Sequence, residues 1–297
     1  MGPRSEDFTG LRLPIPEFAR TLPISGPTFA RPDPDLVRRL YAVGSATASA
    51  VMHRMGVRQT FIQGPVARQP GAKVVGPVVT LAFMPKREDV VSGVGASTSR
   101  TPETGSGTGG GAEPDGGGAS EEHVEKRSAL WDVFGTVQPG DILAVQAFGD
   151  MHTGCMGEML VTYFHGRGGA GIVVDGCVRD WPRIQEIGTP LWTRGFTPNY
   201  ASQGRLFPWA SNVPITCSHV LVLPGDLMIA DDDGAVVVPA QMAPLVLRHT
   251  LDHEEWEEFS RLKLAEGGDL AKYYPLDEEG WAEYVAWREA RDEGAST

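Results

Sequence analysis

The sequence predicts an α/β fold, with one domain built on a mixed β-sheet. Apolar, β-branched runs alternate with helix-like segments between residues 35 and 240, and strand-like runs are concentrated in the middle of the chain. With 297 residues, 41% of them hydrophobic, the chain is long enough to bury a core. We therefore expect a domain at 35–240, preceded by an arm at 1–34 and followed by a helical extension at 241–297.

The first third of the chain predicts an arm, a helix and a strand. Residues 1–34 are rich in proline and lack a sustained period, so we expect an extended arm that lies on the body or on a neighbouring subunit. Residues 35–57 place apolar side chains at helical spacing. Residues 74–84 are apolar and β-branched, which predicts a buried strand broken at Gly76-Pro77.

A segment rich in glycine, serine and threonine interrupts the domain at 92–122. It has almost no apolar side chains to bury, so we expect a flexible loop. A phosphate-binding loop is excluded because the pattern GxxxxGK[ST] is absent. A helical pattern at 121–137 then leads through a Pro-Gly-Asp turn into an apolar strand at 142–147.

The last third of the chain changes from short strands to helices. Residues 211–239 read as short strands joined by Pro-Gly-Asp and Asp-Asp-Gly turns. Residues 240–265 show helical periodicity, and a second helix is expected at 277–291 after the Tyr-Tyr-Pro break. These two helices form the predicted extension.

Composition excludes several classes of function. The formal charge of −12 and the pI of about 5.0 argue against nucleic acid or an anionic membrane as the main partner. The three cysteines lack CxxC spacing, so we expect reduced, buried thiols and no zinc cage or disulfide framework. No secretion signal or membrane-spanning run is recognisable, which favours a cytoplasmic protein.

Charged residues flank one α/β unit at 154–180. Arg179 and Asp180 follow an apolar strand, and Glu158 begins the preceding helical run. Because α/β proteins often place their sites at the carboxyl ends of strands, these side chains can converge. Two carboxylates without clustered His or Cys suit a hard divalent cation such as Mg²⁺, and the arginine can bind a carboxylate or an oxyanion. A surface turn with an ion pair explains the same spacing, and the residues alone leave both open.

The same stretch resembles the RraA-like family of class II pyruvate aldolases. The resemblance rests on Gly157-Glu158, the Gly-x-x-Gly turn at 168–171, VVDGCVRD at 173–180 and the late DDDGAVVVP at 231–239. It covers roughly residues 35–86 and 124–240. It implies an αββα sandwich, similar to swivelling phosphohistidine domains, that assembles as a homotrimer or a dimer of trimers.

The resemblance also implies roles for individual residues. Asp180 would ligate Mg²⁺ or Mn²⁺, Glu158 would orient a metal-bound water, and Arg179 would contact the keto or enolate oxygen. Backbone amides of Gly157, Met159 and Leu160 would hold the substrate carboxylate. The sequence departs from the aldolase pattern at Glu158, where relatives have aspartate.

The implied activity is retro-aldol cleavage of a 4-hydroxy-2-keto acid, which releases pyruvate. Decarboxylation of oxaloacetate or another 2-keto acid passes through the same enolate and is the enzymatic alternative. A regulator that binds a ribonuclease is the alternative from a different class, since family members are described as inhibitors of such an enzyme.

Other polar residues are weaker candidates. His152 and His165 flank the central stretch, and ordinary surface roles are the simpler interpretation of both. His249 and His253 share a helical face, but their acidic surroundings favour a solvated surface. The three acids at 231–233 are best explained as a turn.

Overall fold

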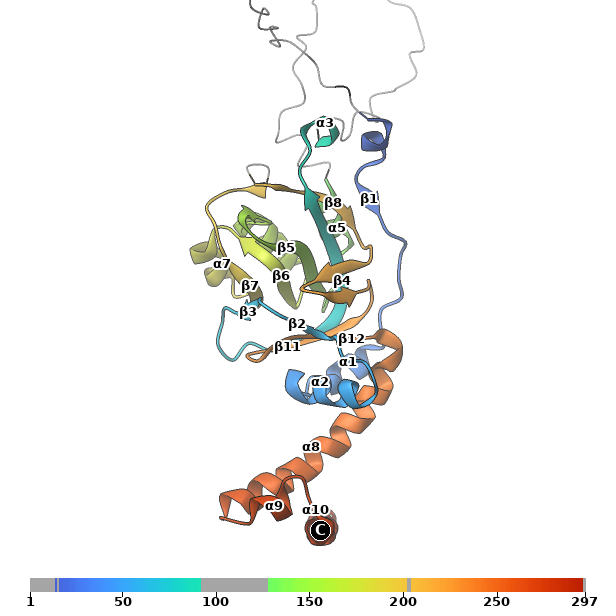
Figure 1. The fold of residues 1–297 in the computed structure, drawn as a ribbon, viewed down its shortest axis with the longest axis vertical. Helices are drawn as coiled ribbons and strands as arrows, with labels where there is room; N and C mark the ends of the chain where they lie inside the picture. The colour runs from blue at the N-terminus through green and yellow to red at the C-terminus, as the bar shows by residue number, and fades with distance from the viewer. Residues whose placement is uncertain (1–13, 15, 92–127, 202–203, 296–297) are drawn as a thin grey trace, which may run out of the picture.

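A computed structural model describes residues 14, 16–91, 128–201 and 204–295, so the predicted loop at 92–122 lies outside the described residues. Four layers build the body: helices, a largely parallel set of strands, antiparallel strands, and a second set of helices (Figure 1). The predicted α/β class and the αββα arrangement are both confirmed.

Four adjacent strands form the parallel part of the sheet. They are β4 (Val74–Pro85), β5 (Ile142–Gly154), β6 (Gly171–Val178) and β7 (Leu191–Phe196). Every residue of β6 is buried, because layers cover both faces of the sheet. This explains why its sequence is apolar on both faces and does not alternate, with Asp175 as the exception.

Strand β4 connects the two strand layers. Its first residues pair with antiparallel β11, and from Val78 onward it pairs with parallel β5. The predicted break at Gly76-Pro77 is therefore wrong. Gly76 is needed for space, because a Cβ there would lie 2.1 Å from the carbonyl oxygen of Gly140. Pro77 lies where the pairing of β4 changes from β11 to β5. A proline is tolerated there because it has no amide hydrogen to donate.

Eight further strands complete the sheets in the part of the chain that the structure describes. They are β1 (Ile24–Ser25), β2 (Phe61–Ile62), β3 (Val66–Ala67), β8 (Leu206–Ser211), β9 (Ile215–Cys217), β10 (Val220–Val222), β11 (Leu227–Asp231) and β12 (Gly234–Val238). The hairpin of β11 and β12 turns at the three aspartates, as predicted.

The described helices lie outside the sheet, on the body or in the C-terminal extension (Figure 1). They are η1 (Glu17–Thr21), α1 (Pro34–Leu40), α2 (Ser45–Arg54), α3 (Glu88–Val91), α5 (Ala129–Thr136), α6 (Glu158–Gly166), α7 (Trp181–Ile187), η4 (Ala240–Met242), α8 (Ala243–Ala265), α9 (Leu270–Tyr273) and α10 (Glu278–Ala295).

The predicted helix at 35–57 is two helices. Gly44 is extended, and the carboxylate of Asp231 accepts hydrogen bonds from the Ser45 amide at 2.8 Å and from its hydroxyl at 2.6 Å. The cap of α2 thus comes from a residue far along the chain, which local pattern does not reveal.

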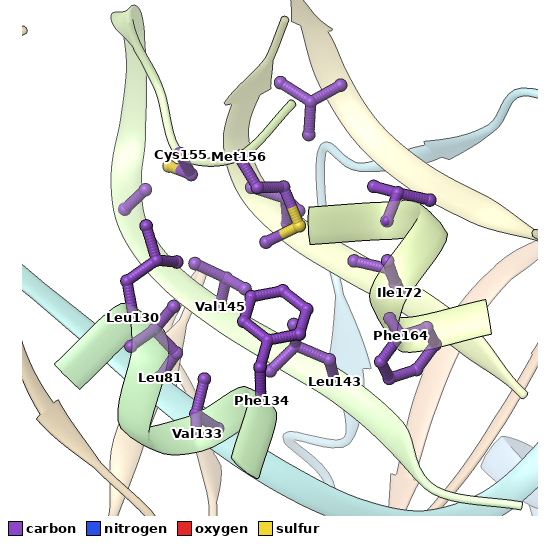
Figure 2. Close-up of a cluster of buried hydrophobic side chains, with 14 of the residues drawn as sticks. Leu81, Leu130, Val133, Phe134, Leu143, Val145, Cys155, Met156, Phe164 and Ile172 are labelled. Carbon is purple, nitrogen blue, oxygen red and sulfur yellow. The ribbon is translucent and has the colours of Figure 1, made fainter. Parts of the chain in front are cut away.

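The main core lies between the parallel strands and helices α5, α6 and α7. Phe134 and Phe164 meet edge to face there, with ring centroids 6.4 Å apart. The side chains of Cys155 and Met156 also point into this core (Figure 2). They anchor the loop before α6, which is where the charged residues gather.

All three cysteines are free and buried, as the sequence predicted. Burial raises the pKa of the Cys155 and Cys217 thiols far above the usual value, because a thiolate there would lose its hydration. Burial therefore disfavours the thiolate form that a nucleophilic cysteine needs.

The described part of the arm lies on the body. Strand β1 pairs in parallel with β8. Further along, Arg31 makes a forked ion pair with Asp141, through Nε at 2.8 Å and Nη2 at 2.7 Å. The Asp141 side chain is fully buried, so its charge depends on this partner.

We expect Arg31→Ala to lower the free energy of unfolding by about 3 kcal/mol, because it leaves a buried carboxylate without its counter-ion. The matched control is Arg38→Ala, which breaks an exposed pair with Asp35 and should change stability by less than about 1 kcal/mol. Urea denaturation of both variants measures the difference. Equal losses would show that the arm is not held by this ion pair.

The C-terminal extension leaves the body along α8 and folds back through α9 and α10 (Figure 1). Its own small core contains Phe259, Tyr273, Leu276 and Tyr284. Among the described helices, none is long and apolar enough to cross a membrane.

Candidate active site

Arg179 and Asp180 emerge directly from the carboxyl end of β6. The strand end is fixed to the loop before α6, because the Arg179 amide donates to the Met156 carbonyl at 3.0 Å and the Cys155 amide donates to the Cys177 carbonyl at 2.9 Å. Asp180 has a left-handed backbone, with φ of 60°. This conformation turns the chain sharply from the strand into α7.

The start of α6 lies against this pair. The Glu158 amide is 3.4 Å from Asp180 Oδ2, and Arg179 Nε is 3.5 Å from the same oxygen. The side chains of Arg179 and Asp180 are 39% and 36% exposed, so both remain accessible to a ligand. The positive end of α6 adds to the attraction for an anion.

Gly157 is the residue that allows this close approach. Its φ of −127° suits any residue, so its backbone does not require glycine. A Cβ at this position would instead lie 2.4 Å from Asp180 Oδ2 and 2.9 Å from Arg179 Nε. The site therefore needs a residue without a side chain at 157.

The carboxylate of Glu158 points to the α7 side of this group. Its Oε2 atom is 4.0 Å from Nε of Arg183, and it borders a surface hollow with Thr162 and Glu186. The sequence predicted that Glu158 and Asp180 can converge. The structure brings the Glu158 amide to the Asp180 carboxylate, but shows no contact between the two carboxylates.

A cavity of about 120 Å³ opens beside Arg179. Its described lining comprises Leu130, Trp131, Gly154, Cys155, Met156, Gly157, Met159, Leu160, Arg179, Tyr200 and Ala201. Arg179 is the charged side chain of this set. Gly157, Met159 and Leu160, which were predicted to hold a carboxylate, all border the cavity. Its volume is well below the roughly 300–1,000 Å³ of pockets for drug-sized ligands, which suits a small substrate.

The donor set fits a hard divalent cation. Asp180 Oδ2 has only long contacts, at 3.4 and 3.5 Å, and a partly exposed carboxylate of this kind can ligate Mg²⁺, which keeps several waters. Among the described residues, no group of three or more His, Cys, Asp and Glu side chains gathers to hold a metal ion. A cation here would therefore depend on water and substrate oxygens for most of its ligands.

The remaining candidate residues lie away from Arg179 and Asp180 or form hydrogen bonds that hold the backbone. Nδ1 of His165 is 3.2 Å from the Thr189 hydroxyl, at the far end of α6. The His152 amide is 3.2 Å from the Asp150 carboxylate, and its side chain is exposed. The aspartates at 231–233 bind backbone groups, including the Gly71 amide at 3.0 Å. The prediction of a turn at these acids is confirmed.

Sequence reasoning missed a buried polar cluster on the other side of β6. Asp175 accepts from Arg194 Nε at 2.6 Å and from the Ser218 amide at 2.9 Å. Asp175 lies within β6, whose sequence is otherwise apolar or glycine, and Arg194 lies in the neighbouring strand β7. An acid inside such a run was the available signal, since a buried charge requires a partner.

Comparison with known proteins identifies relatives that share this fold. Residues 45–237 match the family model described as RraA-like, Aldolase/RraA. The crystal structure of Streptomyces coelicolor RraAS2, described as an unusual member of the RNase ES inhibitor RraA protein family, is 48% identical, with a TM-score of 0.65 over 79% of this chain and 99% of that one.

The relatives with enzyme names include two aldolases. A putative 4-hydroxy-4-methyl-2-oxoglutarate aldolase of Halalkalibacterium halodurans is 34% identical over 44% of this chain and 59% of its own length. The 4-hydroxy-4-methyl-2-oxoglutarate aldolase of Thermus thermophilus is 34% identical over 34% of this chain and 60% of its own. The matches thus span somewhat less than two thirds of either relative.

Proposed function

The chain belongs to the RraA-like family, and on that premise we propose that it is a divalent-metal-dependent carbon–carbon lyase that cleaves a 4-hydroxy-2-keto acid to release pyruvate. The observation that carries this proposal is the meeting of Arg179, Asp180 and the start of α6 around Gly157. The names of the two aldolase relatives support the same reaction class.

Asp180 would hold Mg²⁺ or Mn²⁺ directly, and Glu158 would hold it through a water. When bound, the cation supplies Lewis-acid stabilisation of the charge that develops on the C2 oxygen. The chemistry of the two side chains supports this assignment, because both are carboxylates and Mg²⁺ prefers oxygen ligands.

The protein's own groups would position and stabilise the substrate. Arg179 borders the cavity and can donate to the keto oxygen, where negative charge grows as the C3–C4 bond breaks. Amides of Gly157, Met159 and Leu160 at the start of α6 can bind the carboxylate. A water held by Glu158 would accept the proton of the 4-hydroxyl group. The same stabilisation serves decarboxylation of oxaloacetate, which we expect as a side or alternative activity.

A pyruvate-release assay tests the proposal. Purified protein would be incubated with 4-hydroxy-4-methyl-2-oxoglutarate, other 4-hydroxy-2-keto acids and oxaloacetate, with Mg²⁺ or Mn²⁺. We expect turnover that EDTA abolishes and added metal restores. If none of the 2-keto acids is turned over, the lyase proposal is refuted. If turnover is unaffected by EDTA, the proposed metal dependence is refuted.

Gly157→Ala should lower turnover about 100-fold, because the new methyl group must displace Asp180 or Arg179 and small misplacements of reacting groups carry costs of that size. Gly166→Ala, at the other end of α6, is the matched control, since a Cβ there meets nothing within 4 Å. Steady-state kinetics of both variants is the measurement. Comparable activities in the two would contradict the close-packing argument.

A regulatory function is the second candidate. It is favoured by the 48% identity to RraAS2, which belongs to a family described as ribonuclease inhibitors. The two functions separate experimentally, because inhibition of a ribonuclease by surface contact does not need Asp180. A variant at Asp180 that retained inhibition, in a protein without lyase activity, would favour the regulator.

We further propose that the chain assembles as a homotrimer or a dimer of trimers. Apolar side chains are exposed on β3 and on the second half of β5, where Val66, Phe148 and Met151 are each about half exposed. Such surface is what a subunit interface covers. Multi-angle light scattering measures the mass, and a monomer at micromolar concentration would contradict this assembly.

A further inference from the structure

A second and larger cleft lies between α2, α8 and α10. Its volume is about 480 Å³, four times that of the cavity at Arg179. Its lining comprises Val51, Arg54, Met55, His249, His253, Glu255, Trp256, Trp281, Tyr284 and Arg288. Most of these residues follow residue 237, where the match to the family model ends. The cleft is therefore a feature of the C-terminal extension and is separate from the candidate active site.

Two arginines give this cleft a positive character. Nη2 of Arg54 is 3.5 Å from Nδ1 of His253, whose Nε2 is 3.0 Å from Glu257. The guanidinium of Arg288 lies over the Tyr284 ring at 5.6 Å. Within the described part of the chain, no ion pair joins a carboxylate directly to Arg54 or Arg288. Each guanidinium carries five N–H donors, so both retain donors for a ligand.

The carboxylate in the lining is already occupied. Glu255 accepts from the Tyr284 hydroxyl at 2.9 Å and forms an ion pair with Arg291. Its charge is compensated, so it offsets little of the attraction that Arg54 and Arg288 exert on an anion. Although the chain has a formal charge of −12, the charge balance in this cleft favours an anionic ligand.

Flat aromatic rings form another wall of the cleft. Trp256 and Trp281 have ring centroids 6.2 Å apart at an interplanar angle of 51°, and Tyr284 packs against Trp281 at 5.5 Å. Trp281 is 45% exposed, which leaves much of a large apolar side chain in contact with water. An aromatic ligand placed here would cover that surface and gain ring contacts.

We propose that this cleft binds a small aromatic carboxylate, with its carboxylate on Arg54 and Arg288 and its ring against Trp256 and Trp281. The guanidinium fork matches the two oxygens of a carboxylate, and the indoles match a planar apolar ring. The volume lies in the range typical of small-molecule sites. This site is independent of the proposed lyase activity.

The test uses 2-naphthoate as the probe and 2-naphthol as its uncharged analogue. The full-length protein is titrated by calorimetry and by quenching of tryptophan fluorescence, with excess pyruvate present so that a carboxylate site at Arg179 is occupied. We expect 2-naphthoate to bind with a Kd of about 1 mM or tighter and 2-naphthol to bind about tenfold more weakly, because it lacks the charge-assisted hydrogen bonds.

Arg54→Gln and Arg288→Gln should each weaken 2-naphthoate about tenfold for the same reason. Arg248→Gln, an exposed arginine on α8 outside the lining, is the matched control and should leave the Kd unchanged. Arg54 is exposed on a different helix from Arg288, so its variant remains informative if replacing Arg288 disturbs Tyr284. No binding of 2-naphthoate, equal affinity for 2-naphthol, or an unchanged Kd in Arg54→Gln would each overturn the proposal.

Discussion

Asp180→Asn is expected to reduce pyruvate release about 1,000-fold and to weaken Mn²⁺ binding, without loss of the fold. The proposed cation loses its direct carboxylate ligand, and several kcal/mol of transition-state stabilisation disappear with it. Asparagine is the right replacement because Asp180 has a φ of 60°. Asparagine tolerates that left-handed backbone, whereas alanine would add strain unrelated to metal binding.

The matched control is Glu186→Gln on the adjacent helix α7. Its carboxylate is 68% exposed and pairs with Arg183 at 3.2 Å, outside the contacts around Gly157. It removes the same charge, so it accounts for general electrostatic effects on the site. Turnover and metal titration are compared in the two variants. Retention of metal-dependent turnover by Asp180→Asn would remove Asp180 from the metal assignment.

Arg179→Lys is expected to lower kcat about 100-fold with a smaller change in KM. The guanidinium projects from the end of β6 beside Gly157 and borders the cavity. Lysine keeps the positive charge but cannot reproduce the planar fork, so stabilisation of the growing charge on the substrate oxygen should fall more than ground-state binding.

Arg183→Lys is the control for this substitution. Arg183 is close in sequence, 67% exposed, and contacts Glu158 and Glu186 across the surface of α7. We expect its kcat to stay within a few-fold of the parent, because exposed ion pairs contribute little. Steady-state kinetics with the best substrate from the screen is the measurement. Parental kinetics in Arg179→Lys would argue against its contact with the keto oxygen.

Local pattern was enough to predict the strands that carry the site. The apolar run at 142–147 and the apolar strand predicted before Arg179 are parts of β5 and β6, and Arg179 and Asp180 follow the carboxyl end of β6. These predictions succeed because a strand buried on both faces must be continuously apolar. The prediction of one helix at 35–57 was wrong at Gly44, where the chain is extended. The second helix, α2, is capped by the carboxylate of Asp231 from the opposite end of the domain.

The side-chain directions in the site required the tertiary structure. Spacing placed Glu158 near Asp180, but which group of Glu158 faces Asp180 depends on how α6 packs against α7. The structure brings the amide to Asp180 and leaves the carboxylate beside Arg183. Glu158, which is one methylene longer than the aspartate of the aldolase pattern, is thus compatible with a role in which its carboxylate contacts the metal through a water molecule.

The sequence by itself determined the α/β class, the buried central strands and the choice of Arg179, Asp180 and Glu158 as candidate site residues, because periodicity and residue chemistry are local properties. Only the tertiary structure decided the cap on α2, the pairing of Arg31 with Asp141, the requirement for glycine at 157 and the cleft in the C-terminal extension. Each of these depends on atoms that are distant along the chain and become neighbours when the layers pack.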